Sequence, residues 1–303
     1  MKTRPTLLML FALGAGGLSG CAGEEEDAAV AVGLSTDLAV GFEVRRVETT
    51  ATLSGEVTLT ESWLYTNGEL RLPKELMLPP AADGESVEVS TRAFGEDGGE
   101  ALVSRSVRTT AVAGRTLLVP LSLDEACEGV ACSSGLTCEA GACKNPYVAP
   151  DNLPEYDPGW TSSAKDACKS GSSAETTLTI GKGQEGYSTF ADGDTLPIEA
   201  GPQGGHHAWL ALRVTELRQT GSQMKIEGAY PGLGVELPAV SSMVTLRKAD
   251  EGGCELYAVR FQVDYGLEVE DILGQPIEAT ITLTDPDGAS ASATRTFVIG
   301  AVL

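Results

Sequence analysis

The chain has 303 residues, of which 43 are acidic and 21 are basic, and its formal net charge at pH 7 is −22. A protein this acidic repels nucleic acid and anionic lipid headgroups, which excludes a partner with a phosphate backbone. Glycine, valine, threonine and leucine are plentiful, and long stretches with helical spacing of apolar residues are missing. The composition therefore predicts an all-β protein that is long enough for two domains.

The first 20 residues have the organisation of a secretory signal. A basic start at residues 1–4 precedes 12 residues, Leu7 to Leu18, that carry no charge. This run is shorter than the roughly 20 apolar residues that a helix needs to cross a bilayer. We therefore expect residues 1–20 to be a signal peptide and the protein to be exported.

The signal ends in the sequence Leu-Ser-Gly-Cys at residues 18–21. This sequence resembles the lipobox of bacterial lipoproteins. The resemblance implies that the chain is cut before Cys21, that the Cys21 thiol is acylated, and that the new amino terminus receives a further acyl chain. Stable retention in a bilayer needs more than one such chain. The alternative is an ordinary cleaved signal with a chance cysteine.

Residue 22 bears on sorting, because an Asp directly after the acylated cysteine holds many Gram-negative lipoproteins at the inner membrane. This chain has Ala22. The resemblance therefore implies the outer membrane, with the periplasmic and the surface-facing leaflet both open. The acidic run from Glu24 to Asp27 predicts a solvated tether over residues 21–36.

The other six cysteines form an even set, which suits three disulfides in an oxidising compartment. They are Cys127, Cys132, Cys138, Cys143, Cys168 and Cys254.

A period-two pattern of apolar residues begins at Leu38, where Leu38, Val40, Phe42 and Val44 alternate with smaller or polar residues. Similar short runs follow as far as Leu123. They predict six or seven strands and an N-terminal β-sandwich over residues 37–125.

Four cysteines then fall within 17 residues that offer almost nothing apolar to bury. Their spacing resembles the EGF-like Cys-rich knots of bacterial surface lipoproteins, which implies a disulfide knot over residues 126–144. Four cysteines allow three pairings, and we expect the interleaved one, Cys127–Cys138 with Cys132–Cys143. Zinc is the alternative, although the paired close spacing of a zinc ribbon or knuckle is missing.

Residues 145–159 carry a proline at about every fourth position. This density predicts an extended, semi-rigid linker between two domains. We expect a protease to cut this linker before either domain.

Residues 160–303 are predicted to form a second β-sandwich. Their end, residues 281–299, resembles the closing hairpin of bacterial Ig-like and PKD-type domains, with threonine-rich strands around an Asp-Gly turn. The internal Trp-Asp-Phe-Gly signature of PKD domains is absent. The resemblance therefore implies an Ig-like C-terminal domain. We expect Cys168 to pair with Cys254 across it; pairing of one of them with the knot is the alternative.

The two histidines, His206 and His207, are adjacent in a predicted strand. Neighbouring side chains of a strand point to opposite faces, so the two rings cannot easily share one metal ion. The same alternation places His207, Trp209 and Arg213 on one outward face. This trio is the candidate ligand-binding site, for a glycan or a peptide; packing under a loop or against the other domain is the alternative.

Two stretches look like pieces of calcium loops, Asp192-Gly-Asp194 and Asp285-Pro-Asp287. Neither supplies the further alternating ligands and the bidentate Glu of a full loop, and both suit β-turns. We therefore expect neither a metal nor a cofactor.

Enzyme signatures are missing: no Gly-x-Ser-x-Gly motif outside the signal, no His-Glu-x-x-His, no Gly-Lys-Ser/Thr loop and no Cys-x-x-Cys pair. Paired carboxylates, as in glycosidases, leave no such motif and stay an alternative. We expect a protein without catalytic residues.

The order of segments resembles that of Gram-negative surface lipoproteins. It implies a lipid-anchored, non-catalytic binding or adhesion module that contacts the bilayer through its acyl anchor and an envelope protein or glycan through its distal domain. A structural or accessory subunit of an envelope complex is one alternative, and a metal-binding envelope protein is another.

Overall fold

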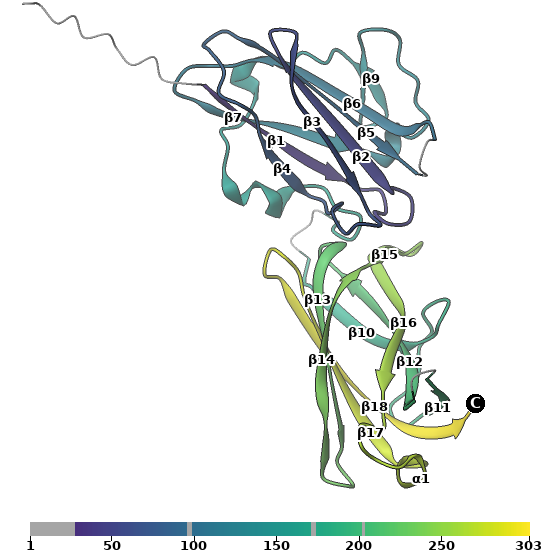
Figure 1. Ribbon diagram of the computed structural model, residues 1–303. Helices are drawn as coiled ribbons and strands as arrows, with labels where there is room; N and C mark the ends of the chain where they lie inside the picture. Colours follow the sequence, from purple (N-terminus) through teal and green to yellow (C-terminus); the bar gives the residue numbers. More distant parts are fainter. Residues whose placement is uncertain (1–27, 96–98, 171–173, 202–203) are drawn as a thin grey trace, which may run out of the picture.

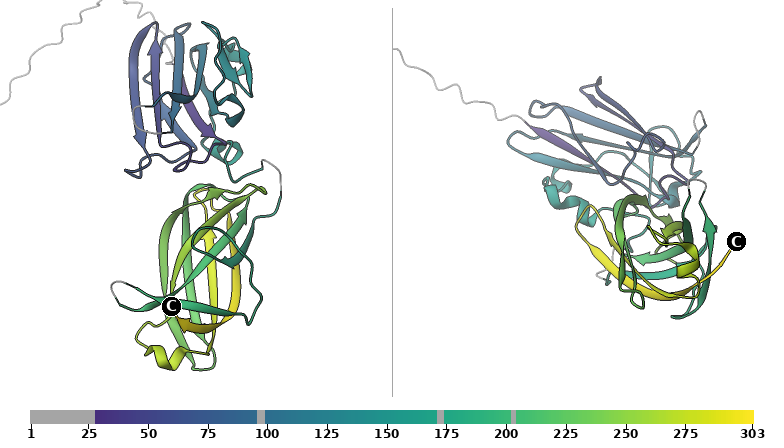
Figure 2. Two further views of the ribbon diagram at one scale, coloured as in Figure 1. Left: turned by 90° about the vertical axis from the view of Figure 1, so that its right-hand side faces the viewer. Right: turned by 60° about the horizontal axis from the view of Figure 1, so that its bottom comes forward.

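The computed structural model describes residues 28–95, 99–170, 174–201 and 204–303. The protein is almost entirely β, with 55% strand and 6% helix. It has an N-terminal unit (residues 28–164) and a C-terminal unit (residues 165–303) that lie end to end (Figures 1 and 2). The expected signal peptide 1–20 and Cys21 lie outside the described residues. Within those residues, no helix has the length and apolar character needed to span a membrane.

The N-terminal unit contains two sheets that share one core. The first has the order β4-β1-β7, in which β1 pairs antiparallel with β4 and parallel with β7. The second is antiparallel, with the order β3-β2-β5-β6. Their strands are β1 (Ala29–Thr36), β2 (Arg46–Leu53), β3 (Glu56–Leu64), β4 (Lys74–Met77), β5 (Ser86–Phe94), β6 (Ala101–Thr110) and β7 (Thr116–Leu123). These seven strands agree with the expected six or seven.

The first strand lies earlier than the sequence pattern predicted. Residues 29–36, expected to belong to the tether over 21–36, form β1, the central strand of the first sheet. The strand is buried on both faces, because the core covers one face and the side chain of Trp160 covers the other. A strand with two buried faces shows no apolar–polar alternation. The pattern from Leu38 to Val44 instead belongs to a turn from which Leu38, Val40 and Val44 reach the core, whereas Phe42 is exposed.

The cysteine knot packs against the N-terminal unit. It contains β8 (Thr137–Glu139) and β9 (Ala142–Lys144), after the short 3-10 helix η1 (Glu125–Cys127). The expected disulfides Cys127–Cys138 and Cys132–Cys143 are both present. The Arg105 guanidinium of β6 donates to the Cys138 carbonyl at 3.1 Å. The knot therefore extends the N-terminal core, with Cys127 and Cys138 buried in it.

Residues 145–164, here named the proline strap, differ from the extended, semi-rigid linker between two domains that was expected over 145–159. The strap contains the 3-10 helices η2 (Pro150–Asn152) and η3 (Pro158–Ser163). Its backbone bonds to β6 and β7: the Arg108 amide donates to the Pro146 carbonyl at 2.8 Å, and the Tyr156 amide donates to the Thr116 carbonyl at 2.8 Å. The strap therefore lies along the N-terminal unit, because these strands offer edge groups that it can pair with.

The C-terminal unit is built from one nine-stranded sheet in the order β14-β13-β17-β18-β11-β12-β16-β15, with β10 also paired to β12. β11 pairs parallel with β18 and antiparallel with β12, and so joins the two halves of the sheet around one core. The elements are β10 (Thr177–Lys182), β11 (Thr195–Ala200), β12 (His206–Thr215), β13 (Thr220–Tyr230), β14 (Val235–Thr245), β15 (Arg247–Lys248), β16 (Cys254–Gln262), α1 (Val269–Ile272), β17 (Pro276–Thr284) and β18 (Ser290–Val302).

Two expectations for the C-terminal unit are confirmed. Cys168 and Cys254 form a disulfide that ties the segment before β10 to the start of β16. β17 and β18 form the closing antiparallel hairpin. Hydroxyl pairs line its outer face, among them Thr280 with Thr294 at 2.9 Å.

Candidate functional site

The candidate trio on β12 is not the open platform that strand alternation predicted. His207 is only 4% exposed, and its ring packs edge-on against Trp209 at 4.6 Å between centroids. Arg213 is held by Glu255 at 2.7 Å and by Glu251 at 3.1 Å, and its guanidinium lies over the ring of Tyr187. The three residues do share one face, on which His207 is buried and neighbouring side chains partly cover Trp209 and Arg213.

The two adjacent histidines lie in different surroundings. The Nδ1 atom of His206 is 2.9 Å from the Oδ2 atom of Asp264. The same oxygen also accepts a hydrogen bond from the His206 backbone amide. Burial raises the pKa of Asp264, but these hydrogen bonds outweigh it and hold that pKa below its usual value. Burial, followed by the nearby charge of Arg260, lowers the pKa of His207. The two rings therefore lie in different electrostatic surroundings.

A small cavity of about 190 Å³ lies beside these rings and is also lined by Arg260 and Gln262. Next to it, His207 Nε2 and Trp209 Nε1 are buried without a hydrogen-bond partner among the described residues. No group of three or more His, Cys, Asp or Glu side chains in the described ranges is arranged to hold a metal ion.

The two calcium-like stretches have other partners. Asp287 accepts from the Arg218 guanidinium at 2.6 Å, and Asp285 accepts from the Arg218 amide at 3.1 Å. Asp192 lies 3.4 Å from Arg295, and Asp194 accepts from the Ala191 amide at 2.9 Å. These carboxylates are occupied by bonds that hold the fold together.

Buried hydrogen bonds fix the two units to each other. The Val40 amide donates to the Gln219 side-chain oxygen at 2.9 Å, and the Gln219 amide group donates to the Leu246 carbonyl at 3.0 Å. The Thr220 hydroxyl donates to the Leu72 carbonyl at 2.9 Å and accepts from the Leu72 amide at 3.2 Å. Because a buried polar group that loses its partner is costly, these bonds hold the units in one orientation.

Ion pairs reinforce this junction. Lys165 lies 2.7 Å from Asp124, which is buried at the end of the N-terminal unit, and Lys248 pairs with Glu125. The hydrogen bonds from Lys165 and Ser122 lower the pKa of Asp124, although burial acts in the opposite direction and is the largest effect. The pair therefore favours the ionised carboxylate.

An arginine with 1% of its surface exposed organises the C-terminal side of the junction. Besides Asp287, Arg218 donates to the Ala164 carbonyl at 3.0 Å and lies 3.8 Å from Asp166. Burial raises the pKa of Asp166 to about 6, against hydrogen bonds from the Cys168 and Gln219 amides and the charge of Arg218.

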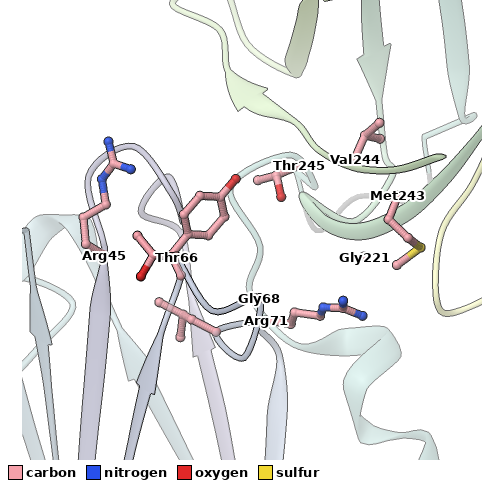
Figure 3. Close-up of a pocket in the computed structure, with 10 residues that line it drawn as sticks. Arg45, Thr66, Gly68, Arg71, Gly221, Met243, Val244 and Thr245 are labelled. Carbon is pink, nitrogen blue, oxygen red and sulfur yellow. The ribbon is translucent and has the colours of Figure 1, made fainter.

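Four cavities of about 420 to 460 Å³ lie along the junction. We name one of them, of about 420 Å³, the junction groove (Figure 3). It is lined by Arg45, Tyr65, Thr66, Gly68, Leu70 and Arg71 of the N-terminal unit and by Gly221, Met243, Val244 and Thr245 of the C-terminal unit. A second cavity of about 450 Å³ shares Arg71, Gly221 and Met243 with it.

The charge of the junction groove is opposite to that of the chain. Its charged lining residues are Arg45 and Arg71, both exposed, and neither forms an ion pair with any described residue. In a chain with twice as many acidic as basic residues, two arginines without acidic partners leave a local positive site. The groove offers guanidinium donors, a tyrosine and apolar side chains, which suit binding.

Sequence reasoning missed these residues because they come from two distant segments, 45–71 and 221–245. The run from Leu237 to Leu246 carries no charge, but residues 129–138 and 200–212 are equally free of charged side chains, so this run gave no specific signal. Nothing in the sequence places that run opposite Arg71.

Comparisons with known proteins add little at this point. No family model matches the chain, and no curated protein matches it. Among solved structures, the chain is similar to a β-glucuronidase of Bacteroides uniformis, with 9% identity and a TM-score of 0.21. The match covers 86% of this chain and 25% of that chain, so this chain spans about a quarter of the enzyme's length. A TM-score this low carries no conclusion about fold or function.

Proposed function

We propose that this protein is an exported, lipid-anchored, non-catalytic binding module of the bacterial outer membrane, and that the junction groove is its binding surface. In this proposal each β unit is an Ig-like sandwich, the knot is an EGF-like staple on the first, and Cys21 carries the acyl anchor. The partner is an anionic segment of an envelope protein or glycan.

The observation that carries the proposal is the pair of arginines in the groove. Arg45 and Arg71 lie on one side of a cavity whose opposite wall belongs to the other unit (Figure 3). Guanidinium groups bind carboxylates with charge-assisted hydrogen bonds, which are stronger than neutral ones. Two such groups without an acidic partner in the described chain favour an anionic ligand.

The walls of the groove are held in place, which also supports binding. Leu72, next to Arg71, makes two hydrogen bonds with Thr220, next to Gly221. A preorganised site loses less conformational entropy when a ligand binds. The fixed junction therefore favours recognition between the units over a role as a passive hinge.

The amino-terminal end of the described chain and the groove lie at different ends of the N-terminal unit. The described chain begins at Ala28, which pairs with Ala81, and the eight residues of β1 separate this end from the junction. At about 3.3 Å per strand residue this is roughly 26 Å. An anchor at Cys21 would thus leave the groove facing away from the bilayer.

Two experiments test the proposal. Replacement Cys21→Ser should abolish labelling by palmitate and move the protein out of the membrane fraction, or leave an uncut precursor. Unchanged membrane partition would contradict the anchor.

The groove is tested separately by fluorescence anisotropy with labelled hexaglutamate and hexalysine. The double variant Arg45→Ala/Arg71→Ala should bind hexaglutamate about tenfold or more weakly than wild type, which corresponds to the loss of one or two charge-assisted contacts. Arg108→Ala is the matched control, since Arg108 is exposed on β6 and likewise forms no ion pair with a described residue. Equal affinity of all three proteins for hexaglutamate would contradict the proposed binding surface.

A further inference from the structure

β14 is an exposed edge strand of unusual character. It is the outermost strand of its sheet and pairs only with β13 among the described strands. The side chains from Pro238 to Met243 are all exposed, including Val240 at 44% and Met243 at 54%. No charged residue occurs between Leu237 and Leu246. Natural proteins usually protect such edges with charges, prolines, bulges or short strands, because free backbone groups there recruit other strands.

The proline, the charge and the extra residues on β14 itself lie in its first half; a second register shift, between Val244 and Thr245, comes from the extra residue Gly221 on β13. Glu236 and Pro238 lie in the first half, and the pairing register with β13 shifts between Leu237 and Val240. From Val240 to Val244 each residue pairs with β13 in regular register, without a proline, a charge or an extra residue on β14. The half that is left open is the half nearer to the junction.

This open half leads into the junction groove. Met243, Val244 and Thr245 form one wall of the groove and face the loop that carries Arg71 (Figure 3). Six residues of strand, 240–245, span roughly 20 Å. An added strand along them would reach the two arginines at its end.

We propose that β14 accepts an extended acidic segment of a partner protein as an additional antiparallel strand, whose N-terminal acidic side chains lie against Arg45 and Arg71. This inference rests on the proposed function and names the ligand class and its binding mode. Main-chain hydrogen bonds to the free edge of β14 supply affinity, as in other strand-addition sites. The arginines determine which end of the acidic segment lies at the groove. Antiparallel pairing continues the arrangement of β13 and β14 and is slightly more stable per residue than parallel pairing.

Charge decides between a partner segment and a second copy of this chain. Pairing β14 with β14 of another copy would bring together two molecules that each carry a net charge of −22. It would also leave Arg45 and Arg71 without an anionic partner. An acidic segment of another protein satisfies the arginines and pairs with the edge at the same time.

The test uses blocked eight-residue peptides and the mature protein. The probe is Glu-Glu-Val-Thr-Val-Thr-Val-Thr, and its reversed control is Thr-Val-Thr-Val-Thr-Val-Glu-Glu. Two further probes carry N-methyl groups on the three valine amides or on the three threonine amides of the first peptide. An added strand uses one edge only, so we expect one methylated peptide to lose tenfold or more in affinity and the other to keep it. The reversed control should bind more weakly than the probe.

Proline replacements in β14 provide the matching protein variants. Amides of successive strand residues point to opposite sides, so one of Ser241→Pro and Ser242→Pro removes an outward amide and the other breaks a bond to β13. The variant with the unchanged melting temperature identifies the outward position. That variant should lose tenfold or more in affinity for the probe.

The outcomes separate this inference from the proposed function. One outcome is that probe binding requires Arg45 and Arg71 but is unchanged by either set of N-methyl groups and by the outward proline. This outcome would overturn strand addition and leave the groove as a binding surface. If the probe does not bind at about 1 mM, a dissociation constant that corresponds to roughly −4 kcal/mol, strand addition is overturned. If hexaglutamate does not bind either, the proposed binding surface is overturned together with strand addition. A dimer in light scattering that the outward proline abolishes would make a second copy the occupant and would also overturn it.

Discussion

The indole ring of Trp160 packs onto the backbone of Gly33 so closely that a β carbon at Gly33 would lie 2.9 Å from two of its ring carbons. The ring nitrogen donates to Glu75 at 3.0 Å, and the Tyr156 hydroxyl donates to the other oxygen of the same carboxylate at 2.6 Å. The end of the proline strap thereby covers the outer face of β1 and β4. The glycine is what allows this approach.

Replacement Gly33→Ala should destabilise the N-terminal unit by about 1–3 kcal/mol, the usual cost of forcing an extra carbon into a packed contact. It should also free the proline strap for proteolysis, whereas the wild-type strap should resist cleavage because its backbone is bonded to β6 and β7. Urea unfolding and timed proteolysis measure the two effects. Gly186→Ala is the control, since a β carbon there meets nothing within 4 Å. Rapid cleavage of the wild-type strap would restore the extended linker expected from its prolines.

The buried carboxyl of Asp166 should make stability depend on pH. Its pKa of about 6 lies above the ordinary value of 3.8, so the folded state binds the proton more tightly than the unfolded state does. The resulting stabilisation is complete below pH 4 and is lost as the pH rises through 6, about 3 kcal/mol in total. Asn does not titrate, so the free energy of unfolding of Asp166→Asn, measured relative to that of the wild type, should be larger at pH 7.5 than at pH 4.5. Urea unfolding at both pH values measures this difference, and a difference that does not change with pH would contradict it.

The disulfide between Cys168 and Cys254 should contribute more to stability than the one between Cys132 and Cys143. Their sequence separations are 86 and 11 residues. In the chain-entropy model these loops correspond to about 4.6 and about 2.8 kcal/mol, respectively. Differential scanning calorimetry of the two double serine variants should show the larger loss of melting temperature for Cys168→Ser/Cys254→Ser. The reverse order would show that closure of the unfolded chain is not the dominant effect.

The side chain of Gln219 should couple the two units. Replacement Gln219→Ala leaves the Val40 amide and the Leu246 carbonyl without this partner. Each unpaired group should lower the free energy of unfolding by about 1–3 kcal/mol. We expect a lower melting temperature and a wider range of inter-unit orientations in small-angle X-ray scattering. Gln184→Ala is the control, because its bond to Glu199 is exposed and lies within the C-terminal unit. Unchanged scattering of Gln219→Ala would mean that other contacts fix the junction.

Local patterns gave much of the fold. The alternation of apolar residues indicated most of the N-terminal strands, because a strand with one buried face repeats every two residues. The closing hairpin was expected from a resemblance to Ig-like domains. The even number of the six cysteines indicated three disulfides, and the pairings that we expected among the open alternatives are the ones present. In contrast, β1 escaped detection, since both of its faces are buried and its sequence does not alternate.

The candidate site was a different matter. Alternation correctly placed His207, Trp209 and Arg213 on one face, but it could not show that Glu255 and Tyr187 cover Arg213 or that His207 is buried. What covers a face is decided by segments far away in the chain.

By itself, therefore, the sequence determined the β character and most of the strand-forming segments, which depend on neighbours along the chain. Only the tertiary structure decided that the proline strap lies on the first unit, that Gln219 and Thr220 lock the two units together, and that Arg71 faces Met243. The physical reason is that these contacts join residues up to 179 positions apart, as Val40 and Gln219 do. No local periodicity encodes such a contact, because it forms only once both units have packed their cores.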